Sequence, residues 1–103
     1  MSWVRVGALD AFTFAPGAAV TVGEREFAVF PTPTSASPYR AIPNSCPHAG
    51  AALHDGDLTG TVVACLWHGW RFDLESGACL TDADDGLPSY AGRVVDGQLE
   101  LDL

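Results

Sequence analysis

The sequence predicts an all-β fold, and three observations support this fold class. Glycine and proline are frequent, with 11 and 7 residues respectively in a chain of 103. Short apolar runs, alternating or rich in β-branched residues, recur between these turn-forming residues. No segment of useful length carries apolar residues at helical spacing. From the usual length of a strand, we expect roughly eight to ten short antiparallel strands.

The N-terminal part of the chain is predicted to contain four strands, at residues 3–8, 19–22, 26–30 and 39–43. A turn at Ala15-Pro16-Gly17 precedes the second strand, and Gly23-Glu24 joins the second and third strands as a hairpin. Residues 31–38, PTPTSASP, form a loop that is too short to be an interdomain linker. The fourth strand delivers the chain to Cys46.

The remainder of the chain is predicted to contain four further strands, at residues 61–64, 71–74, 90–95 and 98–103. Glycines punctuate a loop region before the first of them. Glu75-Ser76-Gly77 and Asp96-Gly97 are hairpin turns, and residues 81–88 form an acidic loop. Because the strands belong to one pattern, residues 1–103 are expected to form a single domain.

Charge and composition exclude several functions. Five basic residues against 13 acidic ones give a formal net charge of −8. Nucleic-acid binding is not expected without a basic stripe, whereas an acidic face speeds encounter with a basic partner. The N-terminus resembles neither a signal peptide nor a twin-arginine signal, and no apolar stretch is long enough to cross a bilayer. We therefore expect no membrane association and a soluble, cytoplasmic protein.

All three histidines and two of the three cysteines lie between Cys46 and Phe72. This stretch contains CPHAGAAL and CLWHGWRF, so that Cys46 stands near His48 and Cys65 near His68. An odd number of cysteines without an export signal favours metal ligation over disulfides. Two thiolates and two imidazoles suit a single tetrahedral zinc ion. They also suit a [2Fe–2S] cluster with both cysteines on one iron and both histidines on the other.

The distribution of ligand types favours the iron–sulfur cluster. Structural zinc sites usually pair cysteine with cysteine and histidine with histidine, whereas each loop here mixes the two ligand types. Gly50 and Gly69 follow the histidines, and we expect them to let backbone N–H groups approach the cluster sulfurs without a Cβ clash. An apolar shell is expected around the site, from Leu53, Leu66, Trp67, Trp70 and Phe72.

The two motifs together resemble those of the Rieske [2Fe–2S] family. They read Cys46-Pro47-His48-Ala49-Gly50 and Cys65-Leu66-Trp67-His68-Gly69-Trp70. The resemblance extends through Leu87-Pro88-Ser89-Tyr90 and covers nearly the whole chain. It implies stacked antiparallel sheets with two cluster-binding loops at one tip. It also implies that Cys46 and Cys65 ligate the buried iron, while His48 and His68 ligate the outer iron and point toward solvent and a partner.

Four positions place the chain within that family. Rieske proteins of quinol-oxidising complexes carry one extra cysteine in each loop, joined as a disulfide, where this chain has Ala51 and Trp67. They also carry serine and tyrosine hydroxyls where this chain has Trp70 and Phe72. Fewer hydrogen bonds to sulfur favour a reduction potential at the low end of the Rieske range of about −150 to +300 mV. The resemblance is therefore to the low-potential, disulfide-free branch, which serves oxygenases and nitrite reductases.

This branch implies an electron-transfer protein and not an enzyme. We expect a monomeric Rieske-type ferredoxin that shuttles single electrons from a flavin-containing reductase to a terminal oxygenase. Docking would be transient and would use the His48/His68 tip. The alternatives are a small Rieske subunit of a nitrite-reductase-like enzyme and a structural zinc-binding domain. A fixed subunit should expose an apolar patch, whereas an acidic face suits transient docking.

Five residues outside the four proposed ligands also carry expectations. His54 is expected to be a surface residue near the docking face, and Cys79 to be a buried small hydrophobe. Asp82, Asp84 and Asp85 lie in the acidic loop, at positions where proteins of the resembled family commonly carry prolines near the cluster. We expect these charges to lower the reduction potential and to steer a basic partner.

Overall fold

The computed structural model describes residues 2–47, 50–67 and 69–103. Within them it has nine strands and two short 3-10 turns, and every strand pair is antiparallel. The elements are β1 Trp3–Ala8, η1 Leu9–Ala11, β2 Ala18–Val22, β3 Arg25–Pro31, β4 Tyr39–Pro43, β5 Asp57–Thr59, β6 Val62–Ala64, β7 Arg71–Asp73, η2 Ala83–Asp85, β8 Tyr90–Val95 and β9 Gln98–Asp102. The predicted all-β fold is confirmed. None of the described helical segments has the length and apolarity that crossing a membrane requires.

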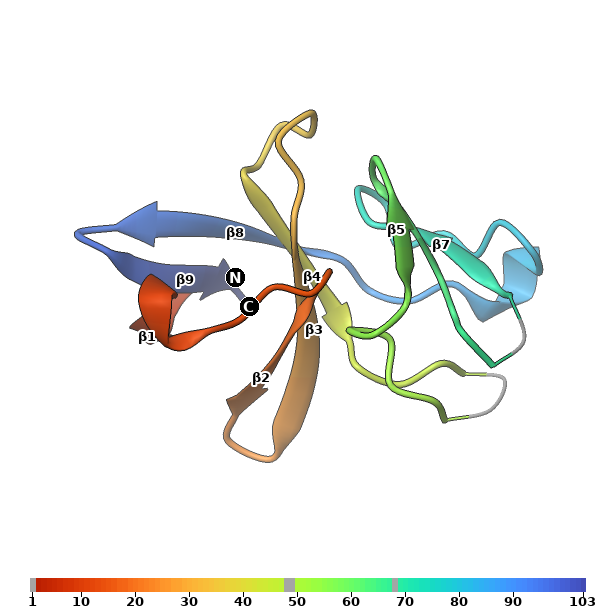
Figure 1. Ribbon diagram of the computed structural model, residues 1–103, viewed down its shortest axis with the longest axis horizontal. Coiled ribbons are helices and arrows are strands. Elements are labelled where there is room, and N and C mark those ends of the chain that lie inside the picture. The colour runs from red at the N-terminus through yellow and green to blue at the C-terminus, as the bar shows by residue number, and fades with distance from the viewer. Residues whose placement is uncertain (1, 48–49, 68) are drawn as a thin grey trace.

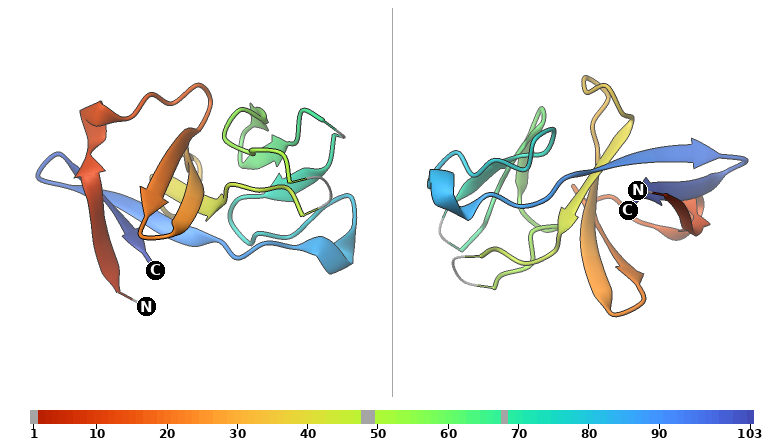
Figure 2. Two further views of the ribbon diagram at one scale, coloured as in Figure 1. Left: turned by 90° about the horizontal axis from the view of Figure 1, so that it is seen from below. Right: turned by 180° about the vertical axis from the view of Figure 1, so that it is seen from behind.

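The strands form two sheets of unequal size. The large sheet has the order β1-β9-β8-β4-β3-β2, and the small sheet has the order β5-β6-β7. Figure 1 shows the small sheet beside one end of the large one, with both chain termini at the large sheet. The connections from β4 to β5 and from β6 to β7 lie at the same end of the molecule in all three views (Figures 1 and 2).

Strand β3 separates two apolar cores. Four consecutive residues, Phe27 to Phe30, are almost completely buried, and successive side chains of a strand point to opposite faces. Phe27 and Val29 therefore enter a core within the large sheet, while Ala28 and Phe30 enter a second core under the small sheet. We call the second one the small-sheet core. It also contains Ile42, Cys46, Ala51, Leu53, Val63, Cys65, Phe72, Leu74 and Cys79.

An arginine on β4 fastens the two sheets to each other. The Arg40 guanidinium donates through Nη2 to the Glu75 carbonyl at 3.0 Å and through Nε to the Leu74 carbonyl at 3.2 Å. Its Nη2 also donates to Ser89 Oγ at 2.7 Å, and that hydroxyl in turn donates to the Leu74 carbonyl. The chain after β7 and the chain before β8 are thus tied to the same side chain of the large sheet.

Two segments differ from the sequence prediction. Strand β5 lies in a region predicted to be loop, and it exists because it pairs with β6 between the turns on either side of it. The predicted strand around 71–74 pairs with the following chain through a single bridge between Phe72 and Cys79 instead of a full hairpin. The acidic loop contains η2, whose first turn is capped where Asp82 Oδ1 accepts from the Asp84 N–H at 3.0 Å.

Candidate metal centre

Two cysteines at strand ends enter the same core. Cys46 follows β4 and Cys65 follows β6, and their exposed fractions are 0% and 2%. Both belong to the small-sheet core. The predicted partners His48 and His68 lie outside the described residues. No three possible metal ligands gather within the part of the chain that the structure describes.

The two cysteine loops share one hydrogen-bonding pattern. In the first loop, residues 46–51, the Cys46 N–H donates to the Ala51 carbonyl at 2.8 Å, and the Gly50 N–H donates to the Cys46 carbonyl at 2.6 Å. In the second loop, residues 65–70, the Cys65 N–H donates to the Trp70 carbonyl at 2.7 Å, and the Gly69 N–H donates to the Cys65 carbonyl at 2.8 Å. Each cysteine therefore occupies the same position in the same kind of turn.

The two loop glycines are needed for their backbone conformation. Gly50 has φ 70° and Gly69 has φ 69°, in the left-handed region that L side chains rarely adopt. A Cβ at either position would meet no protein atom within 4 Å, so among the described residues the positive φ is the feature that favours glycine. Their own N–H groups donate to the cysteine carbonyl of the same loop, and the approach of other backbone N–H groups to cluster sulfurs stays a prediction.

The expected apolar shell is only partly present. Leu53 and Phe72 are fully buried, and Trp70 packs against the small-sheet core. Leu66 and Trp67, in contrast, are 64% and 70% exposed. The prediction was wrong for these two residues because they lie between the residues that close the second loop by hydrogen bonds, where the chain faces solvent. The result is an apolar surface next to His68 in the sequence.

His54, predicted to be a surface residue, is half-buried and hydrogen-bonded in the structure. Its side chain is only 26% exposed, and its Nδ1 lies 2.9 Å from Asn44 Nδ2. The structure therefore reveals Asn44, which sequence reasoning had missed. Its one signal in the sequence was the position of an amide side chain two residues before Cys46.

Cys79 is buried, as predicted for a small hydrophobe. It is 5% exposed and belongs to the same core as Cys46 and Cys65. Its Sγ accepts a hydrogen bond from the Asp82 N–H at 3.2 Å, which links the core to the start of the acidic loop. The η2 turn of this loop lies at the same end of the molecule as the two cysteine loops (Figures 1 and 2).

Most positive charge is engaged away from this end. All five basic residues are arginines. On the large sheet, Arg5 and Arg93 pair with Glu100, Arg25 stacks on Phe27, and Arg40 binds carbonyl groups. The exposed carboxylates Asp82 and Asp84 of the acidic loop lie at the end where the cysteine loops lie. The fifth arginine, Arg71, is exposed at the start of β7, directly after the second loop. This end of the molecule thus carries exposed carboxylates together with one exposed arginine.

These features define a class of protein before any comparison is made. Two buried thiols come from matched loops at one end of a small antiparallel fold, and each loop also carries a histidine in the sequence. Paired thiolates in an apolar core require a compensating positive charge, which iron or zinc supplies. The donor set therefore fits a thiolate- and imidazole-ligated metal centre, of which a binuclear iron–sulfur cluster is one kind.

The profile of the Rieske [2Fe–2S] domain family matches residues 2–91. This chain belongs to the Rieske [2Fe–2S] family, and a [2Fe–2S] cluster is its cofactor.

Relatives of known function narrow the class of protein within the Rieske family. The chain is 31% identical over 102 residues to the anthranilate 1,2-dioxygenase ferredoxin subunit of Burkholderia cepacia, a match that covers 98% of this chain and 92% of that protein. It is 38% identical over 65 residues to the ferredoxin component of the p-cumate 2,3-dioxygenase system of Pseudomonas putida. The second match covers 61% of this chain and 55% of that protein. The likeness to ferredoxins identifies an electron-transfer protein and not an enzyme.

Solved structures share the fold across almost the whole chain. A nitrite reductase (NADPH) small subunit has a TM-score of 0.81 and 27% identity, covering all of both chains. One chain in the complex of reduced oxygenase and oxidized ferredoxin in carbazole 1,9a-dioxygenase matches with a TM-score of 0.76 and 25% identity. The match covers 96% of this chain and 91% of that chain. The same fold thus occurs in both kinds of system.

Proposed function

We propose that this chain is a ferredoxin that carries single electrons from a flavin-containing reductase to a terminal oxygenase. The observation that carries the proposal is the likeness, from end to end, to a ferredoxin subunit of a dioxygenase. We infer further that residues 1–103 act as one domain, as a monomer, in the cytoplasm. The two sheets share β3 and β4 as a common wall between their cores, which supports a single folding unit.

Four residues are proposed to hold the cluster. Cys46 and Cys65 would ligate the inner iron, and His48 and His68 the outer one. The burial of both thiols in one core, and the matched turns around them, support this assignment. When bound, the cluster supplies reversible storage of one electron. Leu53 and Phe72 exclude water from the protein side of the site, because both are fully buried beside the cysteines.

The surface around the second loop supports docking at this end. Leu66 and Trp67 expose apolar side chains directly before His68 in the sequence. Exposed aromatic residues commonly become the buried anchors of protein interfaces. The surrounding carboxylates would attract a basic partner and raise the rate of encounter. A small apolar contact within an acidic surface suits repeated, short-lived docking with two partners in turn.

A small subunit of a nitrite-reductase-like enzyme is the second candidate. The fold similarity to such a subunit favours it. The exposed Leu66, Trp67 and Leu80 would also suit a permanent apolar interface. A fixed subunit would remain in a stable complex with its large chain, whereas a diffusing carrier would dissociate after each transfer.

A reconstituted electron-transfer chain tests the proposal. The holoprotein is mixed with NADH and the reductase of the anthranilate 1,2-dioxygenase system, and bleaching of the cluster absorbance is followed. The oxygenase component is then added, and reoxidation is recorded. We expect one electron per chain in each direction, and sedimentation velocity should give a monomer before and after turnover. A stoichiometric complex with a sirohaem-containing nitrite reductase chain, together with no transfer to the oxygenase, would contradict the proposal.

A further inference from the structure

We propose that Asn44 is a positioning residue that sets the geometry of the first cluster loop. Its side chain ties the strand that enters the loop to the segment that leaves it, and so fixes where Cys46 is presented. The inference rests on the ligand set proposed above. Asn44 has no part in that ligand set.

The carbonyl oxygen of the Asn44 side chain closes the base of the loop. Oδ1 accepts from the Leu53 N–H at 2.8 Å and from the His54 N–H at 2.9 Å. Because Asn44 precedes Cys46 and these two residues follow the loop, the side chain spans the loop from entry to exit. The Cys46 N–H to Ala51 carbonyl bond forms a second closure inside the first. The two described ends of the loop are therefore held together by two nested sets of hydrogen bonds.

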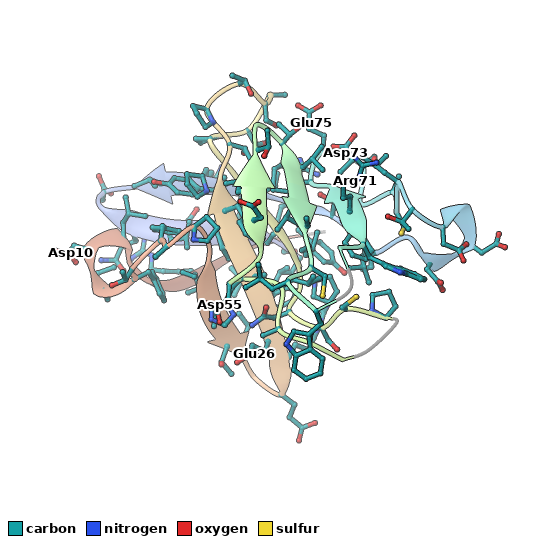
Figure 3. The ribbon with its side chains drawn as sticks, turned by 45° about the vertical axis from the view of Figure 1, so that its right-hand side comes forward. Asp10, Glu26, Asp55, Arg71, Asp73 and Glu75 are labelled. Atoms are coloured by element: carbon teal, nitrogen blue, oxygen red, sulfur yellow. The ribbon has the colours of Figure 1, made fainter. Side chains whose placement is uncertain are left out.

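The amide nitrogen of Asn44 anchors this closure to the large sheet. Nδ2 donates to Glu26 Oε1 at 3.1 Å, on β3, and to His54 Nδ1 at 2.9 Å. The Asn44 backbone N–H also donates to the Glu26 carbonyl at 3.0 Å. Figure 3 labels Glu26 and Asp55, the two carboxylates at the ends of this network. The loop base is thus attached to the wall between the two cores.

The contacts determine the orientation of the amide and the tautomer of the histidine. Asn44 is 7% exposed, and all four of its side-chain hydrogen-bonding positions are used. A flipped amide would place its NH₂ against two backbone N–H donors. His54 Nδ1 must then accept, so the ring proton lies on Nε2, which is 3.4 Å from Asp55 Oδ1.

Each substitution at this position removes a different part of the network. Alanine leaves the Leu53 and His54 N–H groups without their acceptor. Aspartate keeps that acceptor but faces the Glu26 carboxylate with a second negative charge. If Glu26 becomes glutamine as well, its amide can donate to the new carboxylate, and His54 can donate from Nδ1 as the other tautomer. The double variant therefore restores all four hydrogen bonds with two donors exchanged.

The rate at which the cluster is lost tests this inference. Holoproteins carrying Asn44→Ala, Asn44→Asp or Glu26→Gln/Asn44→Asp are mixed with an iron chelator, and the decay of visible absorbance is followed. Residues that orient metal ligands typically change metal affinity by about 10–100-fold. We expect about tenfold faster loss for Asn44→Ala. A smaller effect is expected for Asn44→Asp, and a rate near the unsubstituted protein for the double variant. EPR g-values should shift in the same order.

A matched control separates positioning from general destabilisation. Thr32 is also completely buried, and its hydroxyl donates to the Ser37 carbonyl at 3.0 Å in the β3–β4 loop. That loop projects from the side of the molecule opposite the cysteine loops (Figures 1 and 2). Thr32→Val should lower the melting temperature without changing cluster loss or EPR. Identical behaviour of Asn44→Ala and Thr32→Val, or no rescue in the double variant, would overturn the inference.

The ligand assignment is tested separately in the same preparations. Cys46→Ala and His48→Ala proteins should contain no Rieske cluster. If they retain one, the proposed ligand set is wrong. If they lose it while Asn44→Ala matches the unsubstituted protein in loss rate and EPR, only the positioning role is wrong.

Discussion

Three cysteines share one apolar core, yet only two of them occupy the matched turns. Cys46 and Cys65 each donate through their N–H and accept through their carbonyl within a six-residue loop. Cys79 instead lies in the bridge beside β7, and its sulfur accepts from a backbone N–H. Burial alone therefore does not distinguish a ligand from a packing residue. The local backbone does, and it predicts different consequences of substitution.

Replacing each cysteine by alanine should separate these roles. Cys46→Ala and Cys65→Ala should yield protein without the visible absorbance and EPR signal of a [2Fe–2S] cluster, because a methyl group cannot ligate iron. Cys79→Ala should keep both signals, and it serves as the control for removing a buried thiol from the same core. Chemical analysis of iron and sulfide gives the number of iron and sulfide ions bound per chain in each variant. Cluster loss in all three variants, or in Cys79→Ala alone, would contradict the assignment.

Single residues near the site were predictable only where the sequence carries a motif. The spacing of the cysteines and histidines was sufficient to predict the family, and the family was sufficient to predict the cofactor. The exposure of Leu66 and Trp67 was not predictable, because apolar residues beside a cofactor normally read as its shell. Asn44 was missed because its partners come from β3 and from beyond the loop, and a contact between distant segments leaves no local pattern.

At the scale of elements, the long apolar strand was predicted and its role was not. Consecutive buried residues in β3 mark a strand covered on both faces, but only the fold shows that the two faces meet different cores. Strand β5 was missed because its three residues contain a single apolar side chain, too short a pattern to predict a strand, and they form one by pairing with β6. Element order and strand bounds elsewhere follow the turn residues, which act locally.

The link between the two sheets gives a prediction at this scale. Arg40→Met keeps much of the side-chain length but removes the hydrogen bonds to the Leu74 and Glu75 carbonyls. Hydrogen bonds to charged groups contribute about 1.5–3 kcal/mol. We expect the free energy of unfolding to fall by about 2 kcal/mol, measured by urea denaturation.

A second arginine provides the control for that measurement. Arg25→Met removes an exposed guanidinium that lies over the Phe27 and Tyr90 rings and donates to the Tyr90 hydroxyl at 3.0 Å, all within one sheet. Such contacts contribute about 0.5–1 kcal/mol at exposed sites. An equal loss of stability in both variants would mean that Arg40 does not join the sheets. Hydrogen exchange should also show faster opening of β7 in Arg40→Met only.

For the whole molecule, the distribution of charge gives two measurable effects. The variant Asp82→Asn/Asp84→Asn/Asp85→Asn removes three charges from the acidic loop, and the asparagine introduced at position 82 can still cap η2. Fewer negative charges near the cluster favour the reduced state, so the reduction potential should rise. Reduction by a basic reductase should slow at low salt, and the difference should vanish at high salt as screening shortens the range of the charges.

A triple variant with the same change in charge is the control. Asp10→Asn/Glu24→Gln/Asp96→Asn alters carboxylates of η1 and of two hairpin turns of the large sheet. Asp10 is labelled in Figure 3 at the end opposite the acidic loop. Potential and rate should change little. Equal changes of potential and rate in both triple variants would indicate an effect of net charge alone. An unchanged potential and rate in the acidic-loop variant would contradict the steering role.

The proposed docking combines this long-range attraction with short-range contact, and a substitution at Trp67 tests the short-range contact alone. Trp67→Ala leaves charge unchanged, so its effect should persist at high salt, where that of the aspartates disappears. A tryptophan anchor is worth about 2 kcal/mol, which corresponds to about thirtyfold weaker binding to the oxygenase. Trp3→Ala is the control, since Trp3 is also exposed but stacks with Arg93 on the large sheet. Stopped-flow titrations at two salt concentrations should give a higher half-saturating oxygenase concentration and an unchanged potential for Trp67→Ala. If the two tryptophan variants transfer electrons alike, the partner does not contact the second loop.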